Sequence, residues 1–331
     1  MKARPYNRGG PEDVPSGTSV TVSGTARLHL GFFDLDGGLG RRFGSIGLSL
    51  SGPVTSLVAR RAATTRISGP EHERAARYAA LMDQRIGRSG GYELEIRQAM
   101  PSHAGLGSGT QIALAVATAL RRLHGLPDDL RGDADHLGRG GRSGIGIGLF
   151  SQGGLVIDGG KGNLPGPAPL LVRMPVPAAW RVLLVLDRER EGLSGPRERD
   201  AFDTLGPMKP AVSGAICRLV LMQVLPALAE QDLAAFGAAV TAMQQHVGDY
   251  FAPSQGGRFS SPLVADAMQV LADAGATGIG QSSWGPTGFA FAASDHDARH
   301  FAAVLEQQGM TKRLDLLICR VLNRGASVTL A

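Results

Sequence analysis

The chain has 331 residues and a mass of 34.5 kDa, enough for one large domain or two moderate ones. Hydrophobic residues make up 43% and charged residues 19%, which excludes wholesale disorder, and its 47 glycines follow no three-residue period, which excludes collagen. The net charge is +5, and 30 of the 34 basic residues are arginine, whose planar fork suits carboxylates and phosphates. Since no basic run is interleaved with aromatic residues, we expect no nucleic-acid partner.

The sequence also bears on location. No basic and then apolar leader opens the chain, and the apolar run at residues 111–120 is too short to cross a bilayer. Cys217 and Cys319 lie in apolar stretches without metal-ligand spacing, as reduced core thiols do. We therefore expect a cytoplasmic protein that has no membrane partner.

Strand patterns dominate the first half. Residues 1–17 are polar and rich in proline and glycine, so we expect a disordered tail. Alternating or short apolar runs predict strands over residues 18–30, 92–100, 153–160 and 181–187. Helical spacing predicts helices over residues 71–88 and 107–124, of which the second is strongly apolar.

The second half is mainly helical. Helices are predicted over residues 211–228, 232–250, 262–274 and 295–308. A strand, a glycine loop and a strand occupy residues 275–292, and residues 314–322 predict a final strand. This order indicates an α+β fold with two lobes, which we place at residues 18–190 and 191–331.

The segment PSHAGLGSGT, residues 101–110, joins a strand to the apolar helix. Its glycines let a ligand approach the backbone, and a helix N-terminus offers free N–H groups. The segment is not a P-loop, because no Gly-Lys-Ser/Thr follows. A plain strand-to-helix turn is the alternative, but the three glycines with Ser102, Ser108 and Thr110 favour a phosphate site. The candidate substrate-binding residues are Gly105, Leu106, Gly107, Ser108, Gly109 and Thr110.

Charged residues crowd the strand and loop of residues 25–42. Arg27 and His29 share one strand face, which predicts an anion-binding surface, and we take them with Asp34 as candidate catalytic residues. The alternatives are a packed histidine at position 29 and turn-forming aspartates at Asp34 and Asp36.

Three further loops contain candidate substrate-binding residues. The run LVLDREREGLSG, residues 184–195, ends an apolar strand in acid and leads into a charged helix; a plain connection is the alternative. The glycine loop at residues 281–288 permits close approach of a ligand or another loop, and residues 244–257 add amides and an aromatic pair. These loops contribute Ser194, Gly195, Gln255, Ser283 and Gly285.

Together these segments resemble the GHMP kinase superfamily. Its second shared motif, Pro-x-x-x-Gly-Leu-Gly-Ser-Ser-Ala, is similar to residues 101–110, and its third is similar to residues 281–288. The resemblance covers most of the chain from Gly24 onward. It implies a ribosomal S5-like N-terminal lobe, a ferredoxin-like C-terminal lobe and a ligand in the cleft between them.

A non-kinase branch, the β-ribofuranosylaminobenzene 5′-phosphate synthases, is more similar. The resemblance rests on ARLHLGFFDLDG, FGSIGLSL, GLGSGTQIALAVA, GRSGIGIGLFSQGGLVIDGG, EGLSG and QSSWGPTGFAF. It implies a pentosyltransferase of early tetrahydromethanopterin biosynthesis. Such an enzyme joins phosphoribosyl diphosphate to 4-aminobenzoate or 4-hydroxybenzoate and releases carbon dioxide and diphosphate.

The resemblance also implies a homodimer and a Mg²⁺ cofactor, for which Asp36 and Asp158 are the expected ligands. The acceptor carboxylate would be oriented by Arg27, Arg41 or Arg42.

One departure separates this chain from many superfamily kinases. These have an acid in a Ser-Gly-x-Asp element, where this chain has Ser143-Gly144-Ile145-Gly146. Glycine cannot accept a proton, so we expect no phosphate transfer from ATP. An ATP-dependent small-molecule kinase is the alternative, and a sugar- or phosphate-binding regulator without activity is a third possibility.

Overall fold

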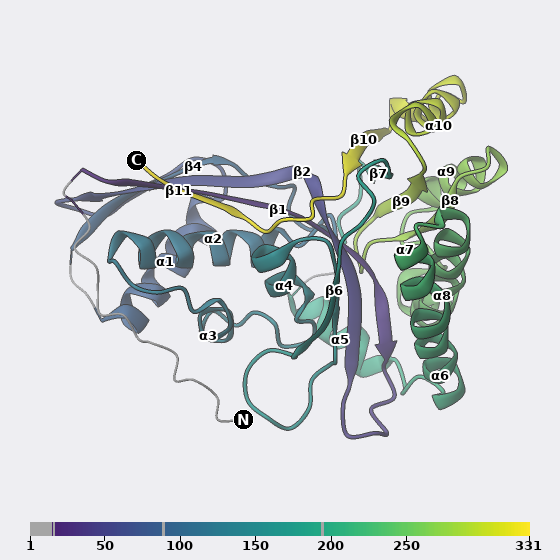
Figure 1. The fold of residues 1–331 in the computed structure, drawn as a ribbon, viewed down its shortest axis with the longest axis horizontal. Helices are drawn as coiled ribbons and strands as arrows, with labels where there is room; N and C mark the ends of the chain where they lie inside the picture. Colours follow the sequence, from purple (N-terminus) through teal and green to yellow (C-terminus); the bar gives the residue numbers. More distant parts are fainter. Residues whose placement is uncertain (1–14, 16, 88–89, 193–194) are drawn as a thin grey trace.

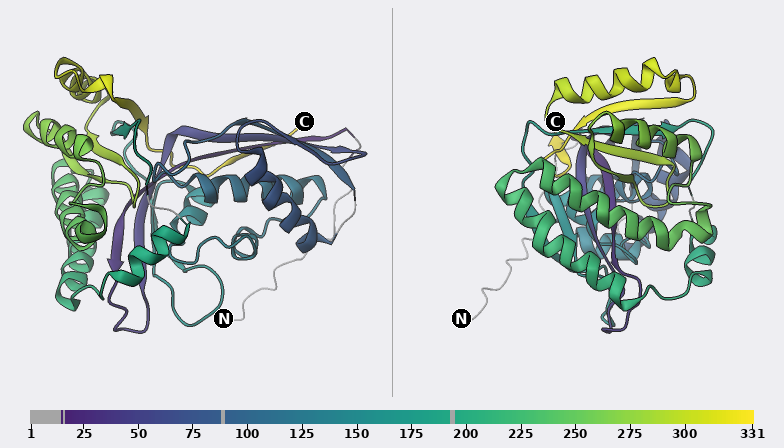
Figure 2. Two further views of the ribbon diagram at one scale, coloured as in Figure 1. Left: turned by 180° about the vertical axis from the view of Figure 1, so that it is seen from behind. Right: turned by 90° about the vertical axis from the view of Figure 1, so that its right-hand side faces the viewer.

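The computed structural model describes residue 15 and residues 17–87, 90–192 and 195–331 (Figure 1). Most of the predicted tail, residues 1–17, lies outside the described residues, and so does Ser194. The described chain forms two sheets, each packed against helices, and the two long strands β1 and β2 join the two parts of the molecule (Figures 1 and 2).

Seven strands of the described chain form the first sheet. They are β1 (Ser19–Asp34), β2 (Phe43–Ala62), β3 (Arg66–Ser68), β4 (Gly91–Gln98), β5 (Leu155–Asp158), β6 (Leu170–Met174) and β11 (Ser327–Leu330). Their order is β11-β1-β2-β4-β3, with β5 on the other half of β2 and β6 beside β5. The far half of the β1–β2 hairpin runs along α6 (Pro210–Leu219) and α8 (Leu233–Gln255) (Figure 1).

The helices of the first part are α1 (His72–Ile86), α2 (Ser108–Leu123), α3 (Leu130–His136) and α4 (Ile145–Gln152). The predicted apolar helix, α2, is buried between α1 and the face of β1 and β2 (Figure 1). Its small apolar residues allow close packing on both sides, and each buried leucine contributes about 1.5–3 kcal/mol. Gln111 ties α2 to α4 by donating its side-chain amide to the carbonyl of Gly146 (3.2 Å). This bond joins the first turns of α2 and α4.

The second sheet has four described strands, β7 (Arg181–Asp187), β8 (Thr277–Gln281), β9 (Thr287–Ala292) and β10 (Leu314–Arg320), in the order β10-β7-β9-β8. Alternate residues of β7 and β9 face opposite sides. Phe289 and Phe291 pack with α8, whereas Ala290 and Ala292 pack with α9 (Pro262–Asp273) and α10 (Asp295–Gln307). Helices thus cover both faces of this sheet, and the two sheets with their helices confirm the α+β fold class.

The predicted helix over residues 211–228 is not continuous. It is divided into α6, a π-helical turn (Val220–Val224) and α7 (Leu225–Glu230). Pro226 explains the break, because proline has no N–H to donate and its ring clashes with the carbonyl four residues earlier, which a wider turn relieves.

The segment Pro210–Glu230 is the one described helical segment that is long and apolar enough to cross a membrane, with a mean hydropathy of 1.7. A core helix passes the same test, and one side of this segment belongs to the protein core through Ile216, Val220 and Val224.

The predicted boundary between the two lobes, at residue 190, does not separate the strands of the two sheets. β7 lies before that boundary but belongs to the second sheet, and the chain returns after β10 to place β11 beside β1. The strand predicted over residues 314–322 is confirmed as β10, but it is not the final strand, because β11 follows it. β11 has four residues and is mostly exposed, so its sequence lacks the apolar alternation that would predict a strand.

Candidate active site

α2 begins beside a cavity of about 350 Å³. Its N-cap, Gly107, has a φ of 81°, which side chains of L-residues rarely allow, and no side chain caps the helix. The N–H of Thr110 donates to the Gly107 carbonyl (3.0 Å), whereas those of Ser108 and Gly109 have no partner among the described residues and can face a ligand. Five of the six predicted phosphate-binding residues line the cavity, namely Gly105, Gly107, Ser108, Gly109 and Thr110. Leu106 is instead buried in the core.

Four arginines line the same cavity. Arg27 comes from β1, Arg74 and Arg77 from α1, and Arg139 from the segment after α3. Glu198, on α5 (Gly195–Thr204), is the one carboxylate among the described lining residues. The excess positive charge fits a ligand with several negative charges, and guanidinium groups suit phosphates in particular.

The Arg27 guanidinium lies between two helix N-termini. A Cβ added to Gly107 would lie 3.0 Å from its Nε, and one added to Gly146 would lie 3.7 Å from its Nη1. The Nε is buried and has no hydrogen-bond partner among the described residues. Burial lowers the pKa of Arg27, an effect that the nearby charges of Glu198 and Asp158 oppose. A buried cation without a close carboxylate is costly until an anion arrives.

The other side of the cavity is arranged around Arg139. Its guanidinium lies over the ring of Tyr78, 5.3 Å from the centroid, and also donates to the Tyr78 hydroxyl. Its Nε is another buried donor without a described partner. Glu198 is paired with Arg142 (2.9 Å), and burial raises the pKa of Glu198, opposed mainly by Arg142 and Arg27.

Two predicted glycines hold loops together. A Cβ on Gly105 would lie 2.2 Å from the carbonyl oxygen of Ser282, and one on Gly285 would lie 2.3 Å from that of Ala104. The Ser282 hydroxyl donates to the Gly105 carbonyl (2.9 Å), and the Thr287 hydroxyl donates to that of Ala104 (2.7 Å). The two glycines thus let the loop before α2 close on the β8–β9 loop.

The same contact brings two strained residues to the cavity. His103 and Ser283 have φ values of 59° and 55°, in the left-handed region. Such strain persists where the surrounding structure enforces it, as at ligand sites. Gly195 also lines the cavity.

His29 shares its strand face with Arg27, as predicted, but faces a narrower crevice. It is 2% exposed, and its ring centroid lies 4.5 Å from that of Phe32. Gln255 and Ser283 line this crevice, and Ser283 also lines the arginine cavity. The structure thus places Arg27, His29 and two predicted binding residues around two spaces that share Ser283 in their lining.

The three aspartates lie elsewhere. The Asp34 carboxylate accepts from the backbone N–H groups of Asp36 (2.8 Å) and Gly37 (3.1 Å), and the Asp36 carboxylate accepts from that of Gly38 (3.0 Å). Neither aspartate lines the cavity, so the turn-forming alternative describes them and the catalytic role predicted for Asp34 has no support from this geometry.

Asp158 is buried beside the start of α4. Its Oδ2 accepts from the hydroxyls of Ser45 and Ser143 and from the N–H of Gly144, and its Oδ1 accepts from the N–H of Gly160. These bonds use the acceptor positions that a metal ion would need. In the described part of the chain, no three His, Cys, Asp or Glu side chains gather as a metal site. The structure thus shows Asp36 in a turn and Asp158 in a buried hydrogen-bond network, while the predicted metal binding stays a prediction.

Replacing Asp158 with asparagine should lower stability and should leave any dependence of activity on Mg²⁺ unchanged. The amide presents a donor where the carboxylate accepts, so at least one buried N–H or O–H loses its partner, at a cost of about 1–3 kcal/mol. Thermal unfolding and a Mg²⁺ titration of the residual activity measure the two effects. Asp36→Asn is the control, expected to be nearly neutral; a raised Mg²⁺ requirement in both variants would contradict this assignment.

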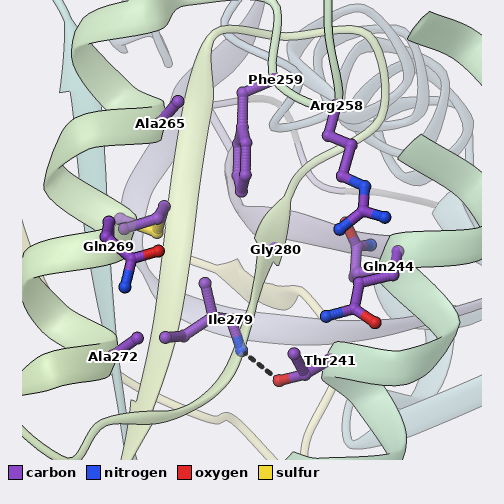
Figure 3. Close-up of a pocket in the computed structure, with 11 residues that line it drawn as sticks. Thr241, Gln244, Arg258, Phe259, Ala265, Gln269, Ala272, Ile279 and Gly280 are labelled. Atoms are coloured by element: carbon purple, nitrogen blue, oxygen red, sulfur yellow. Dashed lines mark hydrogen bonds between the residues drawn. The ribbon is translucent and has the colours of Figure 1, made fainter. Parts of the chain in front are cut away.

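A separate groove of about 190 Å³ lies between α8, α9 and β8 (Figure 3). The Thr241 hydroxyl accepts from the N–H of Ile279 (3.0 Å), as the dashed line in Figure 3 shows. The side-chain carbonyl of Gln244 accepts from the N–H of Gln281 (2.9 Å). These side chains therefore complete the edge strand β8 and are not free for a ligand.

Sequence reasoning missed Arg74, Arg77, His103, Arg139, Glu198 and Trp284. A signal existed for Arg74 and Arg77, which are three residues apart on a predicted helix and so share one face. None existed for Arg139 or Glu198, which reach the cavity only through the tertiary fold.

Comparisons with known proteins agree with this architecture. Family models match at residues 73–148, GHMP kinases N terminal domain, and at residues 224–310, GHMP kinases C terminal. A solved homoserine kinase from Cytophaga hutchinsonii shares the fold, with a TM-score of 0.70 and 19% identity over 94% of this chain and 97% of that one.

Relatives at higher identity have another name. Beta-ribofuranosylphenol 5′-phosphate synthase of Archaeoglobus fulgidus is 35% identical over 319 residues, 92% of this chain and 97% of that protein. The enzyme of the same name from Methanocaldococcus jannaschii is 31% identical over 82% of this chain and 89% of that protein. The resemblance stated from the motifs is confirmed: the chain belongs to the beta-ribofuranosylphenol 5′-phosphate synthase family and has the GHMP kinase fold.

Proposed function

We propose that this protein transfers the phosphoribosyl group of phosphoribosyl diphosphate to 4-hydroxybenzoate. The bond between ribose C1 and the diphosphate oxygen breaks, and C1 bonds to the ring carbon that bears the carboxylate. Carbon dioxide then leaves and its bonding electrons restore the aromatic ring. The product is a ribofuranosylphenol 5′-phosphate, the compound in the name of the relatives, which supports the hydroxyl over the amino acceptor.

The observation that carries this proposal is the unneutralised positive charge of the cavity. Four arginines and one carboxylate line it, and Glu198 is already paired with Arg142. Buried donors without described partners surround it, namely Arg27 Nε, Arg139 Nε and Trp284 Nε1. A sugar with phosphate at two positions supplies the missing charge and acceptors at once.

The same groups assist the reaction. As the C1–oxygen bond lengthens, negative charge grows on the departing diphosphate, and preorganised donors stabilise it most where water is excluded. The N-terminus of α2 and the guanidinium of Arg27 are such donors, because both line the cavity. The acceptor carboxylate must stay loosely held, since a tight bidentate grip would oppose its loss. Arg41 is unsuited to hold it, because its guanidinium donates to the carbonyls of Gly159 and Gly160.

The cavity residues fit Mg²⁺ as an ion shared with the diphosphate. Mg²⁺ is usually held by one or two carboxylates together with substrate phosphates and water. Glu198 is the carboxylate present, and Ser108 and Thr110 add hydroxyls. Because burial raises the pKa of Glu198, a nearby cation would favour its ionised form. When bound, the ion would neutralise part of the charge of the leaving group.

The kinase alternative is less supported. The position of the acid in Ser-Gly-x-Asp is occupied by Gly146, and a Cβ there would lie 3.0 Å from the methyl group of Thr110. An aspartate at this position has no room without movement of its neighbours, and Arg27 is the charged group beside it.

We also propose that the protein is cytoplasmic. Cys217 and Cys319 are free thiols in the structure, as expected in a reducing compartment.

The test uses 4-hydroxybenzoate labelled in its carboxyl group. Labelled carbon dioxide should appear only when phosphoribosyl diphosphate and Mg²⁺ are both present, with diphosphate in equal amount. 4-Nitrobenzoate has a similar shape but withdraws electrons, so it should bind without turnover. Label that stays in a ribosylated product, or acceptor-dependent release of ADP from ATP, would refute the proposal.

A further inference from the structure

His29 carries an unexplained pair of buried polar atoms. Neither ring nitrogen has a hydrogen-bond partner among the described residues, although the side chain is 2% exposed. Its backbone N–H donates to the Ser282 hydroxyl (3.1 Å), so the main chain is fixed while the ring is not. Buried polar atoms in native proteins nearly always have a partner, and each exception requires an explanation.

The space in front of this ring is small. The crevice measures about 10 Å³ and is lined by His29, Phe32, Phe251, Gln255 and Ser283, among others. Such a volume holds one water-sized group and cannot hold a benzene ring. It therefore suits a single hydroxyl at the end of a larger ligand whose body lies outside it.

The body of such a ligand would lie in the arginine cavity, which is next to the crevice. Ser283 borders both spaces, and Arg27 and His29 lie on one face of β1 with one residue between them. Two residues of a strand span roughly 7 Å. A benzene ring whose reacting carbon faces the ribose beside Arg27 would extend its opposite substituent toward His29.

On the basis of the proposed function, we infer that the crevice receives the para hydroxyl of the acceptor and that His29 takes its proton during ring attack. The O–H bond breaks and the proton bonds to a ring nitrogen of His29. The electrons of that bond move through the ring, the carbon opposite bonds to ribose C1, and diphosphate departs. After carbon dioxide leaves, the His29 proton returns to the phenol oxygen.

The electrostatics of the crevice favour a base that is neutral beforehand. Burial and then the charge of Arg27 hold the pKa of His29 well below its usual range, so the ring is unprotonated at neutral pH. The other charged lining residue is Arg258, which is paired with Asp249 (2.5 Å). Because Arg27 opposes a protonated His29, the bound diphosphate must screen Arg27 first, and we expect ordered binding with phosphoribosyl diphosphate before the benzoate.

The test compares two acceptors in one variant. In His29→Gln, kcat with 4-hydroxybenzoate should fall about 10²–10⁴-fold, the usual contribution of a general base. With 4-aminobenzoate it should fall less than tenfold, because an amino group donates electrons to the ring without losing a proton. His29→Asn is the second variant should the first fail to fold, and His246→Gln, outside both spaces, should match the unmodified protein.

The pH dependence separates a base from a structural residue. In the variant, kcat/KM for 4-hydroxybenzoate should recover as pH rises toward the phenol's own pKa, about 10 as for tyrosine, since the hydroxyl then ionises unaided. The kcat/KM for 4-aminobenzoate should show no such recovery. Equal losses with both acceptors, or no loss, would overturn the inference while the unmodified protein still released carbon dioxide. If the unmodified protein released none, the proposed function itself would fail.

Discussion

Replacing Gly107 with valine should weaken the binding of phosphoribosyl diphosphate at least tenfold while the protein still folds. The residue sits at a φ of 81°, where a β-branched side chain is strained, and its Cβ would lie 3.0 Å from Nε of Arg27. The new side chain would either displace the guanidinium or distort the first turn of α2, and both donors would leave their positions. Calorimetric titration measures the binding, and circular dichroism reports whether the fold is kept.

A matched variant controls for the general cost of adding a side chain to a loop glycine. Gly141→Val adds the same atoms to a position that has nothing within 4 Å of an added Cβ and no positive φ. Its affinity for phosphoribosyl diphosphate should equal that of the unmodified protein. Unchanged affinity in Gly107→Val would show that the N-terminus of α2 does not hold the phosphates.

The predicted residues that the structure brings to the cavity are local in sequence. The cradle before α2 was visible because its glycines, the preceding strand and the apolar helix are contiguous, so one segment carries the whole pattern. The shared face of Arg27 and His29 was visible for the same reason, since a strand exposes alternate residues on one side. Short-range periodicity also located most long elements, including α8 and β7, within a few residues.

The parts that were missed depend on contacts between distant segments. Arg139 and Glu198 lie 59 positions apart by residue number and meet only because α1, α2 and α5 line one cavity. Asp158 was named as a metal ligand alongside the resemblance, and its hydrogen-bond partners were not foreseen. Its N–H partner Gly160 is local, but the hydroxyls of Ser45 and Ser143 and the N–H of Gly144 come from two other segments that the sequence does not bring together.

Arg27 has opposite effects on the reaction and on the stability of the fold. Its buried Nε has no described partner, so without substrate the charge lowers the stability of the fold. Substrate binding reverses this effect, because the diphosphate supplies the missing acceptors. An arginine of this kind is retained for its effect on the reaction, at the expense of the unliganded protein.

Arg27→Met should therefore be more stable than the unmodified protein when no ligand is present, and far less active. Methionine fills much of the same volume without charge, so the melting temperature of the free protein should rise by a few degrees. The kcat should fall about 10²–10³-fold, as when one preorganised donor is removed from a developing negative charge. Binding of phosphoribosyl diphosphate should be weakened less than kcat is lowered, since Arg74, Arg77 and Arg139 remain in the cavity.

Thermal unfolding with and without the ligand measures the effect on stability, and steady-state kinetics measures the effect on the reaction. Arg27→Lys, which keeps the charge but loses the fork, should restore only part of the activity. A variant that melts lower than the unmodified protein without ligand would show that Arg27 has a structural partner and is not waiting for an anion.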